Sequence, residues 1–148
     1  MIVLPLADSR LEVHSLLTED VMVALPPSHR WAKRASVPLA ELLRDPDLLL
    51  SMPGHGLRAQ VDEAAQALGV EVAGRIELRS QQALLAMVAA GGGVALAPRM
   101  SVEGREDVVA LPLEPGLSRE IGWVRRRGRH VPPVGARLLE LIRTARQR

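Results

Sequence analysis

The chain has 148 residues but no cysteine, phenylalanine or tyrosine, and two tryptophans are its whole aromatic complement. The absence of cysteine excludes disulfides, thiolate catalysis, thiol redox sensing and metal sites with sulfur ligands. Because aromatic side chains are so few, recognition of nucleic acid by base stacking is not expected. The apolar fraction of 47% must build a core from leucine, valine, alanine and methionine.

Long apolar runs are also missing. No run approaches the roughly 20 residues needed to cross a bilayer, and the N-terminus lacks the basic-then-apolar order of a secretion signal. We therefore expect no membrane association and a cytoplasmic location. The length is that of one ordinary domain or two small lobes.

Charge is unevenly distributed along the chain. The net charge is only +2, although the sequence pI is about 10.3. Residues 119–148 contain nine arginines and two glutamates, so the remainder of the chain is acidic. The basic end could be a phosphate-contacting surface, but a solvated strand and helix face is the favoured interpretation. No direct contact with nucleic acid is expected.

The middle of the chain alternates between strand-like and helix-like segments. Strands are predicted at 48–51, 75–78 and 94–97, with helices at 57–68 and from Ser80 to the glycines at 91–93. Strands separated by helices imply right-handed crossovers and a parallel sheet. The polar clusters that follow the three strands should then meet at one edge, where open α/β sheets bind ligands.

The flanking segments complete the predicted architecture. Before the middle segment, extended structure is predicted at 11–25, with a possible bulge at 18–20, and a short helix at 37–43. After it, a short turn or helix is predicted beyond residue 98, followed by strands at 108–111 and 119–126. A final helix begins at the prolines of 132–133. We interpret the two Leu-Pro breaks at 25–26 and 111–112 as hinge crossings. Residues 26–112 would form one lobe, and residues 1–25 and 113–148 a second, discontinuous lobe.

The second lobe is expected to be incomplete. It has two or three strands and one helix, too little to cover a sheet on both faces.

Four motifs resemble one protein family when they are taken in order and at their spacing. They are Glu-Asp-Val-Met-Val-Ala-Leu-Pro at 19–26, Ser-His-Arg-Trp-Ala at 28–32, Gly-His-Gly-Leu-Arg at 54–58 and Met-Val-Ala-Ala-Gly-Gly-Gly-Val-Ala-Leu-Ala-Pro at 87–98. Together they resemble the effector-binding region of LysR-type transcriptional regulators, from about residue 1 to the end.

The resemblance implies an α/β fold like that of the periplasmic binding proteins, with two lobes and a ligand between them. Lobe two would be complete around a parallel βαβαβ core, and lobe one would lack its opening strand-helix-strand portion. The family's helix-turn-helix has no counterpart in this sequence, so any DNA contact would be made through a missing N-terminal domain. The resemblance also implies a small-molecule effector. Because the incomplete lobe would leave apolar surface and strand edges uncovered, we expect the chain to form a homo-oligomer or to fray outside lobe two.

The residues expected to border the effector site are Gly54, His55, Gly56, Leu57, Arg58, Ser80, Gln81 and Pro98. In peroxide-sensing members of the family the reactive cysteine stands at the place of Gly56. Glycine has no thiol, so peroxide sensing at this position is excluded. Backbone N–H groups at a helix start would instead suit an anionic effector.

Each polar candidate also has a structural interpretation. His55 could contact a ligand or be an ordinary solvated turn residue. Arg58 could pair with a carboxylate, although an exposed arginine in the first turn is the favoured role. Ser80 is expected chiefly to cap the following helix. The glycines at 91–93 follow a helix and precede a strand, which indicates a helix C-cap rather than a phosphate loop.

Rival function classes have weaker support. The four histidines lack metal-ligand spacing, and no nucleophile motif or carboxylate pair marks an active site. The adjacent acids Glu19 and Asp20 are expected to face solvent. We therefore expect no enzyme, metal or cofactor. A free-standing small-solute-binding module of the periplasmic type is the alternative function, and an interaction protein is a third possibility.

Overall fold

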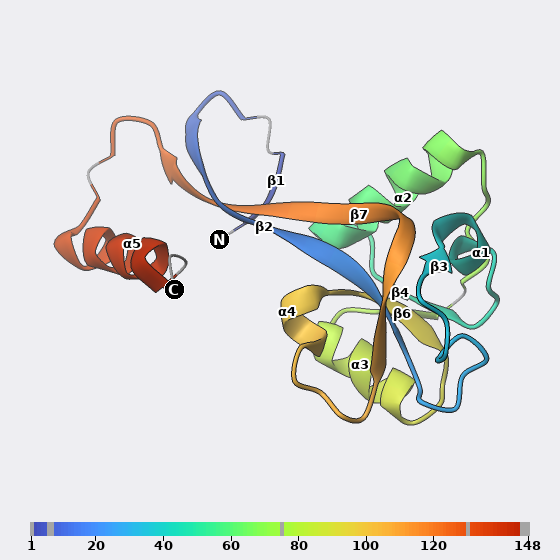
Figure 1. Ribbon diagram of the computed structural model, residues 1–148. Coiled ribbons are helices and arrows are strands. Elements are labelled where there is room, and N and C mark those ends of the chain that lie inside the picture. Colours follow the sequence, from blue (N-terminus) through green and yellow to red (C-terminus); the bar gives the residue numbers. More distant parts are fainter. Residues whose placement is uncertain (1, 6–7, 75, 130, 146–148) are drawn as a thin grey trace. The chain divides into compact units, whose positions relative to one another are not determined.

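The computed structural model describes residues 2–5, 8–74, 76–129 and 131–145. The strands are β1 (Ile2–Leu4), β2 (Leu11–Leu25), β3 (Val37–Pro38), β4 (Leu48–Ser51), β5 (Ile76–Leu78), β6 (Val94–Pro98) and β7 (Val109–Arg126). The helices are α1 (Leu39–Leu43), α2 (Gly56–Leu68), α3 (Gln81–Ala89), α4 (Arg99–Val102) and α5 (Pro133–Ala145). Figure 1 shows these elements in chain order.

The chain forms two compact units, and β2 and β7 each run from one unit into the other. The larger unit is Thr18–Arg119, and the smaller one combines Met1–Leu17 with Glu120–Arg148. These divisions fall within the two long strands, whereas the hinge was expected at the prolines of 25–26 and 111–112. The hinge position stays a prediction.

The sheet of the larger unit has the predicted parallel core. β4 lies between β5 and β6 and is parallel to both, and β2 pairs antiparallel with the far side of β6. The crossovers are α2 between β4 and β5, and α3 between β5 and β6. The predicted βαβαβ arrangement is therefore confirmed.

Local signals explain where the two crossover helices begin and end. α2 ends at Gly69, whose φ of 63° is left-handed and is readily adopted by glycine. α3 begins after Ser80, whose hydroxyl oxygen accepts a hydrogen bond from the Ala83 N–H at 3.3 Å. The capping role predicted for Ser80 is confirmed. Leu68 at the end of α2 is 41% exposed, because the helix meets the core through earlier turns.

Strand alternation sends apolar side chains to both faces of this sheet. One face carries a core with α1, α2 and Trp31, and it includes Val21, Val23, Leu25, Leu48, Leu50, Val94 and Leu96. The other face is covered by α3 and α4 over Met22, Ala24, Leu49, Ala95 and Ala97. Both faces of the parallel strands are thus buried, as such a sheet requires.

Two local predictions were wrong. β7 is one strand that continues through Pro112, which is exposed and precedes the parallel pairing of Leu113 with Val37 of β3. Proline is tolerated where its missing N–H is not needed in a ladder. β2 includes residues 18–20, and the bulge expected there stays a prediction. The helix expected at 37–43 starts only at Leu39, because the two preceding residues form β3.

The smaller unit has little buried apolar surface of its own. β1 pairs antiparallel with β7, and Gly122 of β7 lies so close that a Cβ atom there would meet the His14 carbonyl oxygen at 2.7 Å. The His14 and Trp123 rings stack with their centroids 4.3 Å apart. The apolar side chains of α5 are strongly exposed at Val134 (83%), Leu138 (58%) and Leu141 (52%).

Candidate functional site

The polar clusters that follow the parallel strands meet at one edge of the larger unit, as the sequence predicts. Ser51 at the end of β4 is in register with Leu78 at the end of β5, and the Met52 N–H extends the pairing to the Leu78 carbonyl at 3.1 Å. β6 lies on the other side of β4, and its last residue, Pro98, pairs with Val21 of β2. We call this the carboxyl edge.

The turn at 54–58 places the start of α2 at the carboxyl edge. Gly54 has a φ of 91°, in the left-handed region that favours glycine. His55 is the N-cap in an extended conformation, and its exposed side chain makes no capping hydrogen bond. Within the described residues, the N–H groups of Gly56 and Leu57 have no acceptor. The helix therefore presents free donors and the positive end of its dipole here.

Arg58 does not have the exposed, uncommitted role that was favoured for it. Its side chain is only 16% exposed and donates to the Ser51 carbonyl at 3.0 Å, to Asp62 at 2.8 Å and to Glu77 at 2.5 Å. The hydrogen bond to Glu77, and then that to Asp62, raises the pKa of Arg58 above its ordinary value. The positive charge of the guanidinium is therefore already balanced by two carboxylates, Asp62 of α2 and Glu77 of β5.

The remaining predicted site residues contribute mainly through their backbone. The Leu57 side chain is buried in the core beneath α2, so only its N–H can face a ligand. The Gln81 side-chain amide donates to the Leu96 carbonyl at 3.3 Å, which ties the start of α3 to β6. Pro98 is buried where β6 ends. The assignment of these residues to an effector site stays a prediction.

A buried carboxylate at the same edge was not predicted. The Glu19 side chain is only 5% exposed. It accepts from the Arg119 Nε and Nη2 atoms at 2.9 and 2.6 Å and from the Met100 N–H at 3.1 Å. The expectation that Glu19 faces solvent was wrong, because Arg119 reaches it from β7. The neighbouring Asp20 is exposed and pairs with Arg99 at 2.9 Å.

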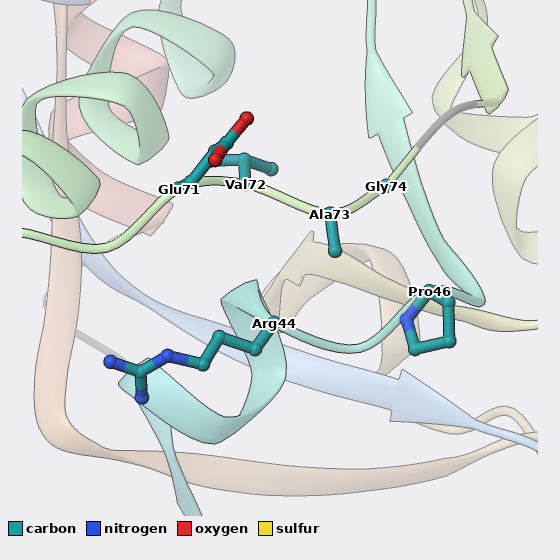
Figure 2. Close-up of a pocket in the computed structure, with 6 residues that line it drawn as sticks. All are labelled: Arg44, Pro46, Glu71, Val72, Ala73 and Gly74. Carbon is teal, nitrogen blue, oxygen red and sulfur yellow. The ribbon is translucent and has the colours of Figure 1, made fainter.

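Neither of the two larger cavities is lined by a residue predicted for the effector site. One of about 650 Å³ is lined by Arg44, Pro46, Glu71, Val72, Ala73 and Gly74. Figure 2 shows the segment at 71–74 passing over the turn that carries Arg44 and Pro46, with the Ala73 methyl pointing towards that turn. It opens where β4 begins, at the opposite edge of the sheet from the predicted site. No motif in the sequence indicates it, because it forms between two connecting segments.

Two further cavities lie one in each unit. A hollow of about 10 Å³ lies beneath the start of α2 and is lined by Leu57, Arg58, Leu96 and neighbouring residues, which leaves room for about one water molecule. Another of about 680 Å³ lies in the smaller unit between residues 8–14 and Arg127. The part of the chain that the structure describes contains no cluster of histidine and carboxylate side chains able to hold a metal ion. None of its helices is long and apolar enough to cross a membrane.

Comparisons with known sequences identify relatives among transcriptional regulators. The family model of the LysR substrate binding domain matches residues 1–147. The DNA-binding transcriptional dual regulator OxyR of Escherichia coli K12 is 35% identical over 132 residues, which cover 86% of this chain and 43% of that protein. An uncharacterized HTH-type transcriptional regulator of Mycobacterium tuberculosis is 34% identical over 129 residues, which cover 80% of this chain and 40% of the relative.

Solved structures show the same fold. The reduced OxyR regulatory domain from Pseudomonas aeruginosa superposes with a TM-score of 0.81 at 29% identity, covering 97% of this chain and 70% of that one. The regulatory domain of Synechocystis CcmR in complex with 2-PG gives a TM-score of 0.83 at 18% identity, with 97% and 71% coverage. The effector binding domain of QuiR in complex with shikimate gives 0.76 at 18% identity, with 93% and 65% coverage.

The chain belongs to the LysR substrate binding domain family and has its α/β fold of the periplasmic-binding-protein type. The family and fold predictions are confirmed. The chain spans less than half the length of the curated relatives that it matches. The relatives are regulators rather than enzymes, and some are hydrogen peroxide-inducible genes activators. This chain contains no cysteine.

Proposed function

We propose that this chain is the small-molecule effector-sensing region of a LysR-type transcriptional regulator and binds its effector at the carboxyl edge of the larger unit. The observation that carries the proposal is the position of two helix N-termini there. α2 and α3 both begin directly after neighbouring parallel strands whose ends are in register at Ser51 and Leu78. Open α/β sheets bind ligands at this edge.

The chemistry of the edge favours a small anion. The Gly56 and Leu57 N–H groups of α2 have no acceptor in the described part of the chain. Helix N-termini attract negative charge through such donors and through the helix dipole. At α3, Ser80 already satisfies one N–H group by accepting from Ala83. Gly56 has neither a thiol nor a hydroxyl, so recognition at this position would be through the backbone.

The regulatory output would lie outside residues 1–148. Since the matched relatives are more than twice as long as their aligned segments, we propose that DNA binding belongs to another part of the regulator, which acts in the cytoplasm as a homo-oligomer and not as an enzyme. Effector binding would change the population of conformations of the sensing region and hence the packing of the subunits. The net charge of +2 gives little drive for direct DNA contact.

A ligand screen with a charge variant tests this proposal. Thermal unfolding would be followed with succinate, benzoate, shikimate and inorganic phosphate, and at least one anion should raise the melting temperature in a saturable way. The Gly56→Asp variant places a carboxylate at the first position of α2, where it suits the helix dipole but repels an anion. We expect the variant to fold and to lose the stabilisation.

Gly116→Asp is the matched control. Gly116 is exposed, and the only neighbouring atom that a Cβ there would approach within 4 Å is the Leu113 carbonyl oxygen, at 4.0 Å. This variant adds the same charge within β7 rather than at the first position of α2, so it should retain ligand stabilisation. Equal binding by the wild type and Gly56→Asp would place the site elsewhere and refute the proposal.

A further inference from the structure

The buried carboxylate of Glu19 holds an arginine at the carboxyl edge in a fixed orientation. One oxygen, Oε1, accepts from both Nε and Nη2 of Arg119, and the other, Oε2, accepts from the Met100 backbone N–H. Burying a carboxylate is costly unless it is paired and hydrogen-bonded. Here the pairing partner is itself only 19% exposed, so both side chains are confined by their surroundings.

Arg119 has donors left over after this pairing. A guanidinium carries five N–H groups in a rigid plane, and Glu19 takes one from Nε and one from Nη2. Within the described residues, no other acceptor lies on Arg119, so both N–H groups of Nη1 and the second of Nη2 are uncommitted. The Nη1–Nη2 side of a guanidinium matches the two oxygens of a carboxylate.

The position of Arg119 is close to the start of α2. Ser118, the preceding residue of β7, accepts at its carbonyl from the Gln60 side chain of α2 at 3.3 Å. Along β2, Glu19 has the same alternation as Val21 and Val23, which face the core covered by α2. The guanidinium and the first turns of α2 therefore belong to the same face and the same edge of the sheet.

Three other arginines at this edge are less suited to this task. Arg79, which follows β5, is exposed and is not fixed by burial. Arg58 is shared by Asp62, Glu77 and the Ser51 carbonyl. Arg99 pairs with Asp20, but both side chains are more than half exposed and are not fixed by burial. An exposed pair of this kind contributes little and is screened by salt.

We propose that Arg119 binds the carboxylate of the effector, with Glu19 as the positioning residue that orients its guanidinium. This assignment rests on the proposed function and narrows it to effectors that carry a carboxylate group. The Met100 N–H contributes by holding the second oxygen of Glu19, which fixes the plane in which Arg119 is presented.

The direct test is an NMR titration of the arginine side chains in the full chain. The Arg119 Nε–H signal would be assigned by its loss in Arg119→Lys. Sodium succinate, benzoate, shikimate and inorganic phosphate would then be added at constant ionic strength, with succinamide as the neutral counterpart of succinate. We expect a saturable shift of Arg119 with at least one carboxylate and none with succinamide. A shift with phosphate and with no carboxylate would overturn the carboxylate assignment.

Variants separate ligand binding from stability. Arg119→Gln alone leaves a buried charge unpaired, so the Glu19→Gln/Arg119→Gln double variant removes both charges together. We expect it to fold and to bind the carboxylate at least about tenfold more weakly, as for loss of a charge-assisted hydrogen bond. Arg99→Gln removes one arginine charge at the same edge and should change the affinity less than about twofold.

The outcomes distinguish this inference from the proposed function. If a carboxylate shifts the Gly56 and Leu57 amides while Arg119 is unmoved, or if the double variant binds as well as the wild type, the assignment of Arg119 is wrong and the effector site stands. Equal losses in the double variant and Arg99→Gln would indicate a general charge effect and also refute it. If none of these anions shifts any resonance at the carboxyl edge, both proposals fail.

Discussion

The two compact units of this chain differ in how their apolar side chains are used. In Thr18–Arg119, two clusters of buried residues cover both faces of the parallel strands. In the unit formed by Met1–Leu17 and Glu120–Arg148, the buried apolar side chains of the described residues are Leu4 and Leu16, while α5 exposes three large ones. The larger unit therefore has the means to stabilise itself, and the smaller one has much less.

This difference shows that an amphipathic pattern alone does not determine burial. α3 and α5 both carry apolar side chains at helical spacing. Those of α3 meet the sheet at Leu84, Leu85 and Val88, whereas those of α5 face outward at Val134, Leu138 and Leu141. The pattern predicts which face is apolar, but only the topology provides a surface to cover it.

The largest expected effect comes from the two tryptophans, one in each unit. Trp31 is fully buried and donates from Nε1 to Glu41 at 3.0 Å. Trp31→Ala should lower the free energy of unfolding of the larger unit by about 3–5 kcal/mol. Trp123 is half-buried and stacks on His14, so Trp123→Ala should cost less than about 2 kcal/mol. Urea unfolding followed by circular dichroism measures both.

Comparable losses in the two tryptophan variants would contradict the comparison. They would show that the smaller unit contributes as much stabilising contact as the larger one, despite its exposed helix. Trp31→Phe serves as a control, because it keeps an aromatic ring but removes the hydrogen bond to Glu41, and it should cost less than Trp31→Ala.

Leucine truncation in the two helices gives the second effect. Leu84 of α3 is buried against the sheet, and Leu138 of α5 is 58% exposed. We expect Leu84→Ala to lower the free energy of unfolding by about 2–5 kcal/mol, through lost burial and a residual cavity. Leu138→Ala should lower it by less than about 0.5 kcal/mol. Urea denaturation of both variants measures the two free energies of unfolding. A large loss for Leu138→Ala would mean that α5 is covered in solution.

The parallel core could be predicted because its signals are local. The strand at 48–51 was predicted with its observed bounds, since a short apolar run lies between polar turns. The start of α3 followed from the capping residue Ser80, and the end of α2 from Gly69. The same signals placed the turn at 54–58 and the start of α3 at the carboxyl edge.

The charged contacts at that edge could not be predicted, because they depend on register between distant strands. Glu19 and Arg119 are 100 residues apart in the sequence, and the partners of Arg58 come from both α2 and β5. From the sequence, the adjacent acids at 19–20 are expected to face solvent. In the fold, however, β7 brings Arg119 to Glu19. The continuity of β7 through Pro112 was missed for the same reason, since its pairing partner β3 lies far away in sequence.

Helix capping should give an effect of intermediate to small size. Ser80→Ala removes the acceptor for the Ala83 N–H and should cost about 1 kcal/mol. Ser9 of the smaller unit is exposed, and no hydrogen bond of its side chain occurs among the described residues. Ser9→Ala should therefore be within about 0.5 kcal/mol of the wild type. Equal urea midpoints for the two variants would show that the cap contributes nothing.

The smallest expected effect is a pH dependence of the larger unit through His29. Burial lowers the pKa of His29 from its ordinary value of 6.5, and its Nδ1 accepts a hydrogen bond from the Trp31 N–H at 3.2 Å. This acceptor exists only in the neutral imidazole.

The sign of the His29 effect depends on whether the folded or the unfolded chain binds the proton more readily. Above about pH 6.5, His29 is neutral in both the folded and the unfolded chain, and its full contribution to stability is present. As the pH falls below that value, the unfolded chain takes up a proton that the folded chain resists, so stability declines until the lowered folded pKa is passed. Trp31 fluorescence in a Trp123→Phe background should report a lower urea midpoint at pH 5.5 than at pH 7.5. His29→Asn offers an amide oxygen as an acceptor but does not titrate, so it should reduce this difference. An unchanged difference in His29→Asn would assign the pH dependence to other groups.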